Sequence, residues 1–223
     1  MRRTIKLFCP DGDVENLILG VNPYLPPFDF SVDCLDATVN FDEISEDEFL
    51  DLLDALDEYV YAEEPLSLEE NFVRFAESNG ISVATAESCT GGMIAASIVN
   101  VSGASNVFFE GMVTYNNLSK INRLGVSAET LDSFGAVSEE TATEMANGLL
   151  SENVDFGIST TGIAGPTGGS IEKPVGLVYI GLSYKDLAPV AYRFVFDGDR
   201  KTVRTSAKNA ALFYAWKYLE NIL

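Results

Sequence analysis

Three segments of the sequence combine polar side chains with glycines or basic residues after an apolar run, and the first is Glu87-Ser88-Cys89-Thr90-Gly91-Gly92. Glycine lets a ligand approach the backbone closely, and N–H groups at a helix N-terminus favour an anion or an oxyanion. Ser88 is therefore a candidate nucleophile, with residues 90–92 as candidate substrate contacts and oxyanion donors. A tight turn with a capping hydroxyl would have the same sequence, so both interpretations stay open.

The absence of histidine restricts the chemistry available to such a serine. Ser-His-Asp and Cys-His arrangements are excluded, as are the usual zinc and iron sites. A hydrolase with this sequence must use lysine, tyrosine, a carboxylate or water as its base. Cys89 is a rival nucleophile, but without a histidine to form the thiolate it is better explained as a small buried apolar residue.

The second segment is Tyr115-Asn116-Asn117-Leu118-Ser119-Lys120, which again follows an apolar run. Tyr115 and Lys120 are separated by about one helical turn and could face a common pocket, with Asn116 as a further candidate substrate contact. A partly desolvated lysine with a lowered pKa is a natural general base for a serine. The alternative is an exposed lysine on a surface helix, which is the usual environment of lysine.

The third segment is a long glycine-rich loop followed by two arginines. The loop matches neither the P-loop nor the dinucleotide fingerprint, but it could wrap a phosphate or a ribose. Arg200 and Arg204 offer guanidinium groups to a phosphate, with Lys173 as the next candidate. Surface ion pairs of the two arginines with Asp197 and Asp199 are the alternative. The candidate contacts in the loop are Thr161, Gly162, Gly165, Gly168 and Gly169.

The elements that position these segments alternate between strand and helix from residue 66 onward. This order predicts a three-layer α/β/α sandwich with a mixed, mostly parallel sheet. The predicted strands are 81–86, 108–115, 156–161, 176–183 and 190–196, the last two forming an antiparallel pair. The predicted helices are 68–80, 93–101, a short helix through Lys120 and Leu124, 138–150 with Ser138 as its cap, and 199–221.

Residues 1–65 differ in composition from the rest of the chain. They hold 17 acidic and 3 basic residues, and the whole chain has a formal net charge of −20. Extended segments are predicted at 5–9 and 28–41, and Ser45 is predicted to cap an amphipathic helix with Phe49, Leu52, Leu53, Leu56 and Val60 on one face. We expect a small acidic α+β extension of unknown family, ending near residue 65. This extension either packs the apolar helix face onto the main domain and leaves its acidic residues in water, or it serves as an acidic docking surface or a nucleic-acid mimic.

Composition also restricts partners and compartment. The acidic balance argues against nucleic-acid binding through a basic surface. Three cysteines without CxxC spacing suggest neither a disulfide framework nor a zinc site, and no apolar run is long enough for a membrane. A cytoplasmic protein is expected.

Several blocks, in this order and spacing, closely resemble the CinA C-terminal domain family over about residues 66–223: TAESCTGG, GMVTYNNLSK, LGV, GAVSEE, TGIAGPTGGS and EKPVG. The resemblance implies a homodimeric nicotinamide-mononucleotide amidohydrolase that needs no metal or organic cofactor. It also implies that Ser88 is the catalytic serine, and that Tyr115 and Lys120 are catalytic. The glycine-rich loop and the arginines near Arg200 match positions associated with the nucleotide. The family's larger proteins carry a molybdopterin-binding-like domain first, and residues 1–65 are too short for that.

The mechanism expected on these grounds starts with neutral Lys120 accepting the Ser88 proton, directly or through Tyr115. Ser88 then attacks the carboxamide carbon, and N–H groups near residues 90–92 stabilise the oxyanion. Alternatively, Ser88 and Lys120 position a water for direct attack. Two other functions stay open, namely a non-catalytic pyridine-nucleotide-binding or regulatory module and a serine amidohydrolase acting on a different amide.

Overall fold

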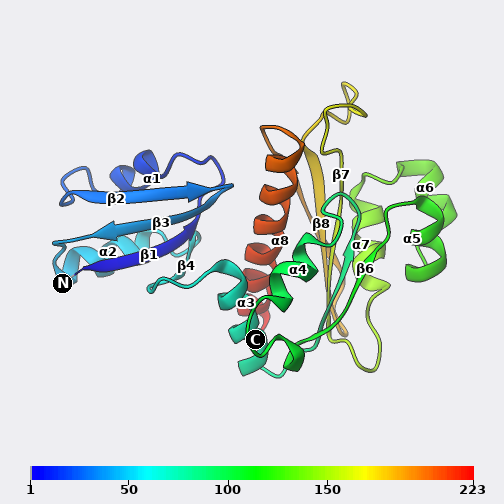
Figure 1. Ribbon diagram of the computed structural model, residues 1–223, viewed down its shortest axis with the longest axis horizontal. Helices are drawn as coiled ribbons and strands as arrows, with labels where there is room; N and C mark the ends of the chain where they lie inside the picture. The colour runs from blue at the N-terminus through cyan, green and yellow to red at the C-terminus, as the bar shows by residue number, and fades with distance from the viewer. Residues whose placement is uncertain (1) are drawn as a thin grey trace. The chain divides into compact units, whose positions relative to one another are not determined.

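The computed structural model describes residues 2–223, and these form two compact units, residues 2–71 and 72–223 (Figure 1). Each unit has its own sheet. In the described part of the chain, no helix combines the length and the apolar character that crossing a membrane requires.

The first unit contains a four-stranded antiparallel sheet with strand order β2-β3-β1-β4. Together with the element order βαββαβ, this is the split βαβ arrangement of ferredoxin-like folds. Alternate residues of β1 and β3 face helices α1 and α2, and these side chains form one apolar core. The elements are β1 (Arg3–Phe8), α1 (Val14–Val21), β2 (Phe28–Asp33), β3 (Asp36–Phe41), α2 (Glu46–Ala55) and β4 (Val60–Ala62).

The helix predicted after Ser45 is confirmed, and it begins with a complete capping box between Ser45 and Glu48. Val60 was predicted on this helix, and that prediction is wrong. The helix ends at Ala55, and Val60 instead pairs with Leu7 in the sheet. Because Val60 follows Leu56 by four residues, a helical period includes it even though the pairing of β4 with β1 determines its conformation.

The second unit is a three-layer α/β/α sandwich around a five-stranded sheet of order β6-β5-β7-β8-β9. Strands β6, β5 and β7 are parallel, β8 runs back against β7, and β9 runs back against β8, so four of the five strands share one direction. Helices α4 and α8 cover one face, and α5, α6 and α7 lie on the other (Figure 1). The predicted mixed, mostly parallel sandwich is therefore confirmed.

The elements of this sandwich follow the predicted order, with two additions, the short 3-10 helix η1 (Ala104–Asn106) and helix α6. Helix α6 was not predicted, and it lies between α5 and α7. The strands are β5 (Val83–Glu87), β6 (Phe108–Val113), β7 (Phe156–Gly162), β8 (Leu177–Tyr184) and β9 (Val190–Val195). The helices are α3 (Leu68–Ser78), α4 (Met93–Val99), α5 (Asn117–Leu124), α6 (Ala128–Phe134), α7 (Glu139–Asn147) and α8 (Arg200–Ile222).

The sheet brings the three chemically interesting segments to one edge. Strands β5, β6 and β7 are parallel neighbours, so their carboxyl ends lie together. The segment 88–92 follows β5, 114–120 follows β6, and the glycine-rich loop follows β7. Open α/β sheets place their ligand sites at this edge.

Candidate active site

The loop after β5 holds Ser88 at the carboxyl end of a strand that lies between β6 and β7. The Ser88 N–H donates to the carbonyl of Thr160 on the neighbouring strand at 2.9 Å, and the Ser88 side chain is nearly buried. Gly91 and Gly92 then take φ values of +62° and +96°, which side chains other than glycine adopt at a cost. The turn therefore needs both glycines in order to lead directly into helix α4.

Lys120 is completely buried and lies beside Ser88. Its Nζ is 3.1 Å from Ser88 Oγ, 2.7 Å from the carbonyl oxygen of Thr114 and 3.3 Å from that of Tyr115. Lys120 lies on helix α5, and Asn116 caps the N-terminus of this helix because its side chain accepts the N–H of Leu118.

Burial lowers the pKa of Lys120, because the charged ammonium loses its hydration, while the nearby Cys89 acts in the opposite direction. Three polar atoms surround Nζ, two carbonyl oxygens and one hydroxyl. A neutral amine has two N–H groups and one lone pair. The lowered pKa favours the neutral amine, which can donate to the two carbonyls and accept the Ser88 proton.

Glu87, directly before the serine, occupies the N-terminus of α4. Its buried carboxylate accepts the N–H groups of Gly92 at 2.8 Å, Ile94 at 3.2 Å and Ala95 at 2.9 Å. The Gly92 N–H, which was predicted as an oxyanion donor, is therefore already used inside the protein. The Thr90 N–H contacts the Cys89 thiol, so of the predicted donors the Gly91 N–H remains.

Replacing Glu87 with glutamine is expected to destabilise the second unit by about 1–3 kcal/mol, because a neutral amide with one oxygen replaces a carboxylate that satisfies three N–H groups. The measurement is denaturant unfolding followed by the emission of Trp216, the only tryptophan of the chain. Glu139→Gln, at an exposed glutamate in the first turn of α7, is the control and should stay within about 0.5 kcal/mol of wild type. Equal effects of both changes would contradict the structural role of Glu87.

Cys89 is a poor candidate for the nucleophile. Its side chain is buried, and burial raises the pKa of the thiol to about 11, although contacts with Thr160 and the local backbone partly oppose this. A thiol with this pKa is protonated at neutral pH.

Two predicted substrate contacts have hydroxyl groups that are engaged inside the protein. The Thr90 hydroxyl is buried and lies 2.7 Å from that of Thr160. The Thr161 hydroxyl is buried and donates to the carbonyl of Ala136. Both hydroxyls join neighbouring segments of the fold, and contact of these residues with substrate stays a prediction.

The glycines of the long loop are explained by close packing within it. A Cβ on Gly165 or Gly169 would lie within 3 Å of Val175 atoms, and a Cβ on Gly162 would be equally close to Leu177 and Val178. Gly168 has a φ of +93°. These glycines let the loop fold back on itself, and contact with a ligand is not needed to explain them.

Lys173 ties this loop to the α6–α7 connection. Its ammonium group donates to the carbonyls of Phe134 at 2.6 Å and Val137 at 2.8 Å. A cation at the C-terminal end of α6 is favourable for the helix dipole. Because these contacts occupy the ammonium group, Lys173 is a weaker phosphate candidate than its sequence position suggests.

A pocket of about 670 Å³ lies between the glycine-rich loop and the start of α8. Arg200 is exposed there and donates to the Gly165 carbonyl at 3.0 Å and to the Tyr115 hydroxyl at 3.3 Å. Arg204 is half-buried and also lines the pocket. The lining residues are Ala164, Pro166, Val175, Gly198, Asp199, Arg200, Lys201 and Arg204.

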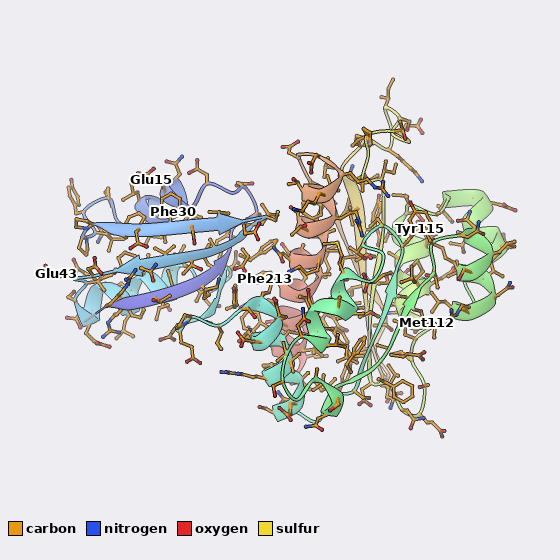
Figure 2. The ribbon with its side chains drawn as sticks, viewed as in Figure 1. Glu15, Phe30, Glu43, Met112, Tyr115 and Phe213 are labelled. Carbon is orange, nitrogen blue, oxygen red and sulfur yellow. The ribbon has the colours of Figure 1, made fainter. Side chains whose placement is uncertain are left out.

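Tyr115 lies beyond the end of β6 (Figure 2), with its side chain 63% exposed. Its hydroxyl accepts a hydrogen bond from Arg200, whereas its backbone carbonyl faces Lys120 Nζ. The geometry thus favours direct proton transfer between Ser88 and Lys120 over transfer through Tyr115.

Two residues that bear on the site were not predicted. Lys201 adds a third cation to the pocket, and its position beside Arg200 in the sequence was an available signal. Glu87 anchors the serine loop, and a carboxylate directly before a glycine-rich turn and a helix was a signal for such a cap.

Comparison with known proteins identifies the second unit. A model of the CinA C-terminal domain matches residues 66–219. The chain is 51% identical over 165 residues to a CinA-like protein of Kosmotoga olearia, and the aligned stretch covers 74% of this chain and 40% of that protein. A relative from Clostridium perfringens strain 13 is 43% identical over 217 residues, which is 94% of this chain and 52% of the relative. A solved structure, the competence/damage inducible protein CihA from Agrobacterium tumefaciens, is 39% identical with a TM-score of 0.62, over 70% of this chain and 96% of that one.

The chain spans about half the length or less of these two curated relatives. An alignment that covers 94% of the chain necessarily includes most of residues 1–65, so the acidic unit has a counterpart in a longer relative. The domain match covers well over half of the chain and includes the buried Ser88–Lys120 pair. On this evidence, the chain belongs to the CinA family.

Proposed function

We propose that this protein hydrolyses the carboxamide of nicotinamide mononucleotide to nicotinate mononucleotide and ammonia. The observation that carries the proposal is the contact between Ser88 and a fully buried Lys120 whose pKa is lowered by burial. A serine beside a neutral lysine is a nucleophile beside its base. The resemblance of the surrounding motifs to the CinA C-terminal domain family supplies the substrate.

In the proposed first step, Lys120 takes the Ser88 proton while Ser88 Oγ bonds to the carboxamide carbon. The oxyanion that forms is stabilised by backbone N–H groups, each worth on the order of 3 kcal/mol. Lys120 then passes its proton to the amide nitrogen as the C–N bond breaks, and ammonia leaves. Lys120 then takes a proton from water, whose oxygen bonds to the acyl carbon, and passes that proton to Ser88 Oγ as the ester C–O bond breaks and the carboxylate is released.

The pocket beside α8 supports a nucleotide as the substrate. Its volume of about 670 Å³ is in the range of small-molecule sites. The pocket is lined by three cationic side chains, those of Arg200, Lys201 and Arg204, and by one carboxylate, that of Asp199. The Asp199 carboxylate accepts the Thr202 N–H and so caps helix α8. A net positive pocket in a protein of net charge −20 is suited to an anionic group such as a phosphate.

The proposal is tested by measuring ammonia release from nicotinamide mononucleotide, nicotinamide riboside and free nicotinamide. The nucleotide is expected to be the best substrate. Tight nucleotide binding without ammonia release would instead support a binding or regulatory module, and turnover of unrelated amides only would support a different amidohydrolase. A homodimer and a cytoplasmic location stay predictions.

Arg200→Met is expected to raise KM for the nucleotide by about 10- to 100-fold, the equivalent of one lost hydrogen bond to a charged group. Turnover of the riboside, which has no phosphate, should change little. Arg193→Met, at an exposed position on β9, is the control and should leave both substrates unaffected. If Arg200→Met weakens both substrates equally, the phosphate is bound elsewhere.

A further inference from the structure

The two arginines at the start of α8 make different kinds of contact. Arg200 is exposed, and its contacts are with the glycine-rich loop and the Tyr115 hydroxyl. Arg204 is half-buried and reaches the serine loop, where Nε donates to the Cys89 carbonyl at 3.0 Å and Nη2 donates to the Thr90 carbonyl at 2.7 Å. One guanidinium group thus holds two consecutive peptide groups.

Holding a carbonyl also sets the direction of the N–H group in the same peptide. In a trans peptide the C=O and the following N–H point in opposite directions. The contacts of Arg204 with the Cys89 and Thr90 carbonyls therefore turn the N–H groups of Thr90 and Gly91 away from the guanidinium.

Of these two N–H groups, that of Thr90 contacts the Cys89 thiol, and the Gly91 N–H is the predicted oxyanion donor that remains. The Glu87 carboxylate accepts the Gly92 N–H, whereas the Arg204 guanidinium donates to the Cys89 and Thr90 carbonyls. The fit is close, since a Cβ on Gly91 would lie 3.3 Å from Arg204 Nη2, and Gly91 has a φ of +62°. The loop is thus fixed by one anion and one cation.

We propose that Arg204, through its contact with the Thr90 carbonyl, is a positioning residue that aims the Gly91 N–H group at the oxyanion formed on the carbon attacked by Ser88. This inference rests on the proposed function. It gives the two arginines different roles: Arg200 binds the substrate phosphate, and Arg204 orients the backbone donor that stabilises the oxyanion. A donor that is aimed correctly acts in the transition state and only weakly on bound substrate, so its loss lowers kcat more than it raises KM.

The test compares Arg204→Met and Arg204→Lys with Arg200→Met, which lies one turn earlier in α8. Arg204→Met is expected to lower kcat by about tenfold or more for the nucleotide and the riboside alike, with little change in KM, since removing one oxyanion donor costs about 10²- to 10³-fold. Arg204→Lys, which keeps one donor group but not the two-point contact, should fall between. If Arg204→Met does not fold, as judged by Trp216 emission, the lysine variant carries the test.

A second readout is the rate at which a fluorophosphonate labels Ser88, because its phosphoryl oxygen also needs the oxyanion donors. Labelling should slow in Arg204→Met and stay at the wild-type rate in Arg193→Met, at an exposed position on β9. Unchanged labelling, or a KM increase for the nucleotide only, would overturn the role of Arg204. A wild-type protein that is labelled but releases no ammonia from the nucleotide refutes the proposed substrate and leaves the labelling comparison decisive. A wild-type Ser88 that is never labelled refutes both.

Discussion

Ser88→Ala is expected to reduce ammonia release from nicotinamide mononucleotide by more than about 10³-fold, because it removes the one atom that bonds to the substrate carbon. The change deletes a single oxygen from a nearly buried site, so the fold and nucleotide binding should persist. Steady-state ammonia release gives the rate, and titration calorimetry with the nucleotide gives the binding.

The control for Ser88→Ala is Cys89→Ala at the adjacent position. Burial holds the Cys89 thiol protonated at neutral pH, so its removal should leave most of the activity. Turnover above a few per cent of wild type in Ser88→Ala, or inactivation by Cys89→Ala, would assign the nucleophile to another group. Burst kinetics would further separate an acyl-enzyme from a directly attacking water.

Lys120→Met is expected to lower kcat/KM by about 10²- to 10⁴-fold, the usual contribution of a general base. In the wild type the rate should rise with pH as Lys120 loses its proton, and the rise should be centred below 10.5, the ordinary pKa of lysine, because burial lowers the pKa. The methionine variant should show no such rise. A flat wild-type profile from mildly acidic to alkaline pH, together with an active variant, would exclude Lys120 as the base.

The same lowered pKa predicts how stability depends on pH. Between the lowered pKa and 10.5, the unfolded chain binds a proton at Lys120 that the folded protein does not. The free energy of unfolding of the wild type should therefore increase relative to Lys120→Met as the pH rises through this window. Below the lowered pKa, Lys120 is charged in both the folded and the unfolded state, so the free energy of unfolding is reduced by the full cost of burying the ammonium group. Denaturant unfolding at several pH values, followed by Trp216 emission, measures this difference.

The association of Ser88 with Lys120 could be anticipated from the sequence, and the direction of other side chains could not. Both residues follow parallel strands, and without histidine few other bases were available. In contrast, a threonine beside a glycine has the same sequence whether its hydroxyl meets a ligand or the protein. The Thr90 hydroxyl meets Thr160, and the two positions are 70 residues apart in the chain, so local sequence patterns do not reveal the contact.

Two of the cationic side chains also make contacts with residues far away in the chain. Arg204 contacts carbonyls that lie 114 and 115 residues away, and Lys173 contacts carbonyls 36 and 39 residues away. Both were predicted as phosphate ligands because a cation near a glycine-rich loop is a general signal for an anion. Only tertiary packing shows that backbone oxygens already occupy these donors.

The reversal of β8 has a consequence for how substrate range could change during evolution. Because β8 runs back beside β7, the two strands are joined by a surface hairpin loop, and no crossover helix has to fit between them. Doubling the length of such a loop costs only about 0.6 kcal/mol in closure entropy. Ser88 and Lys120 come from the β5 and β6 connections, and the hydrogen bonds that hold them include those to Thr160 of β7 and to the carbonyls of Thr114 and Tyr115, which lie outside the loop 163–176. Segments of different length and charge could thus be exchanged at 163–176 to recruit new amides, while the reacting pair is inherited unchanged.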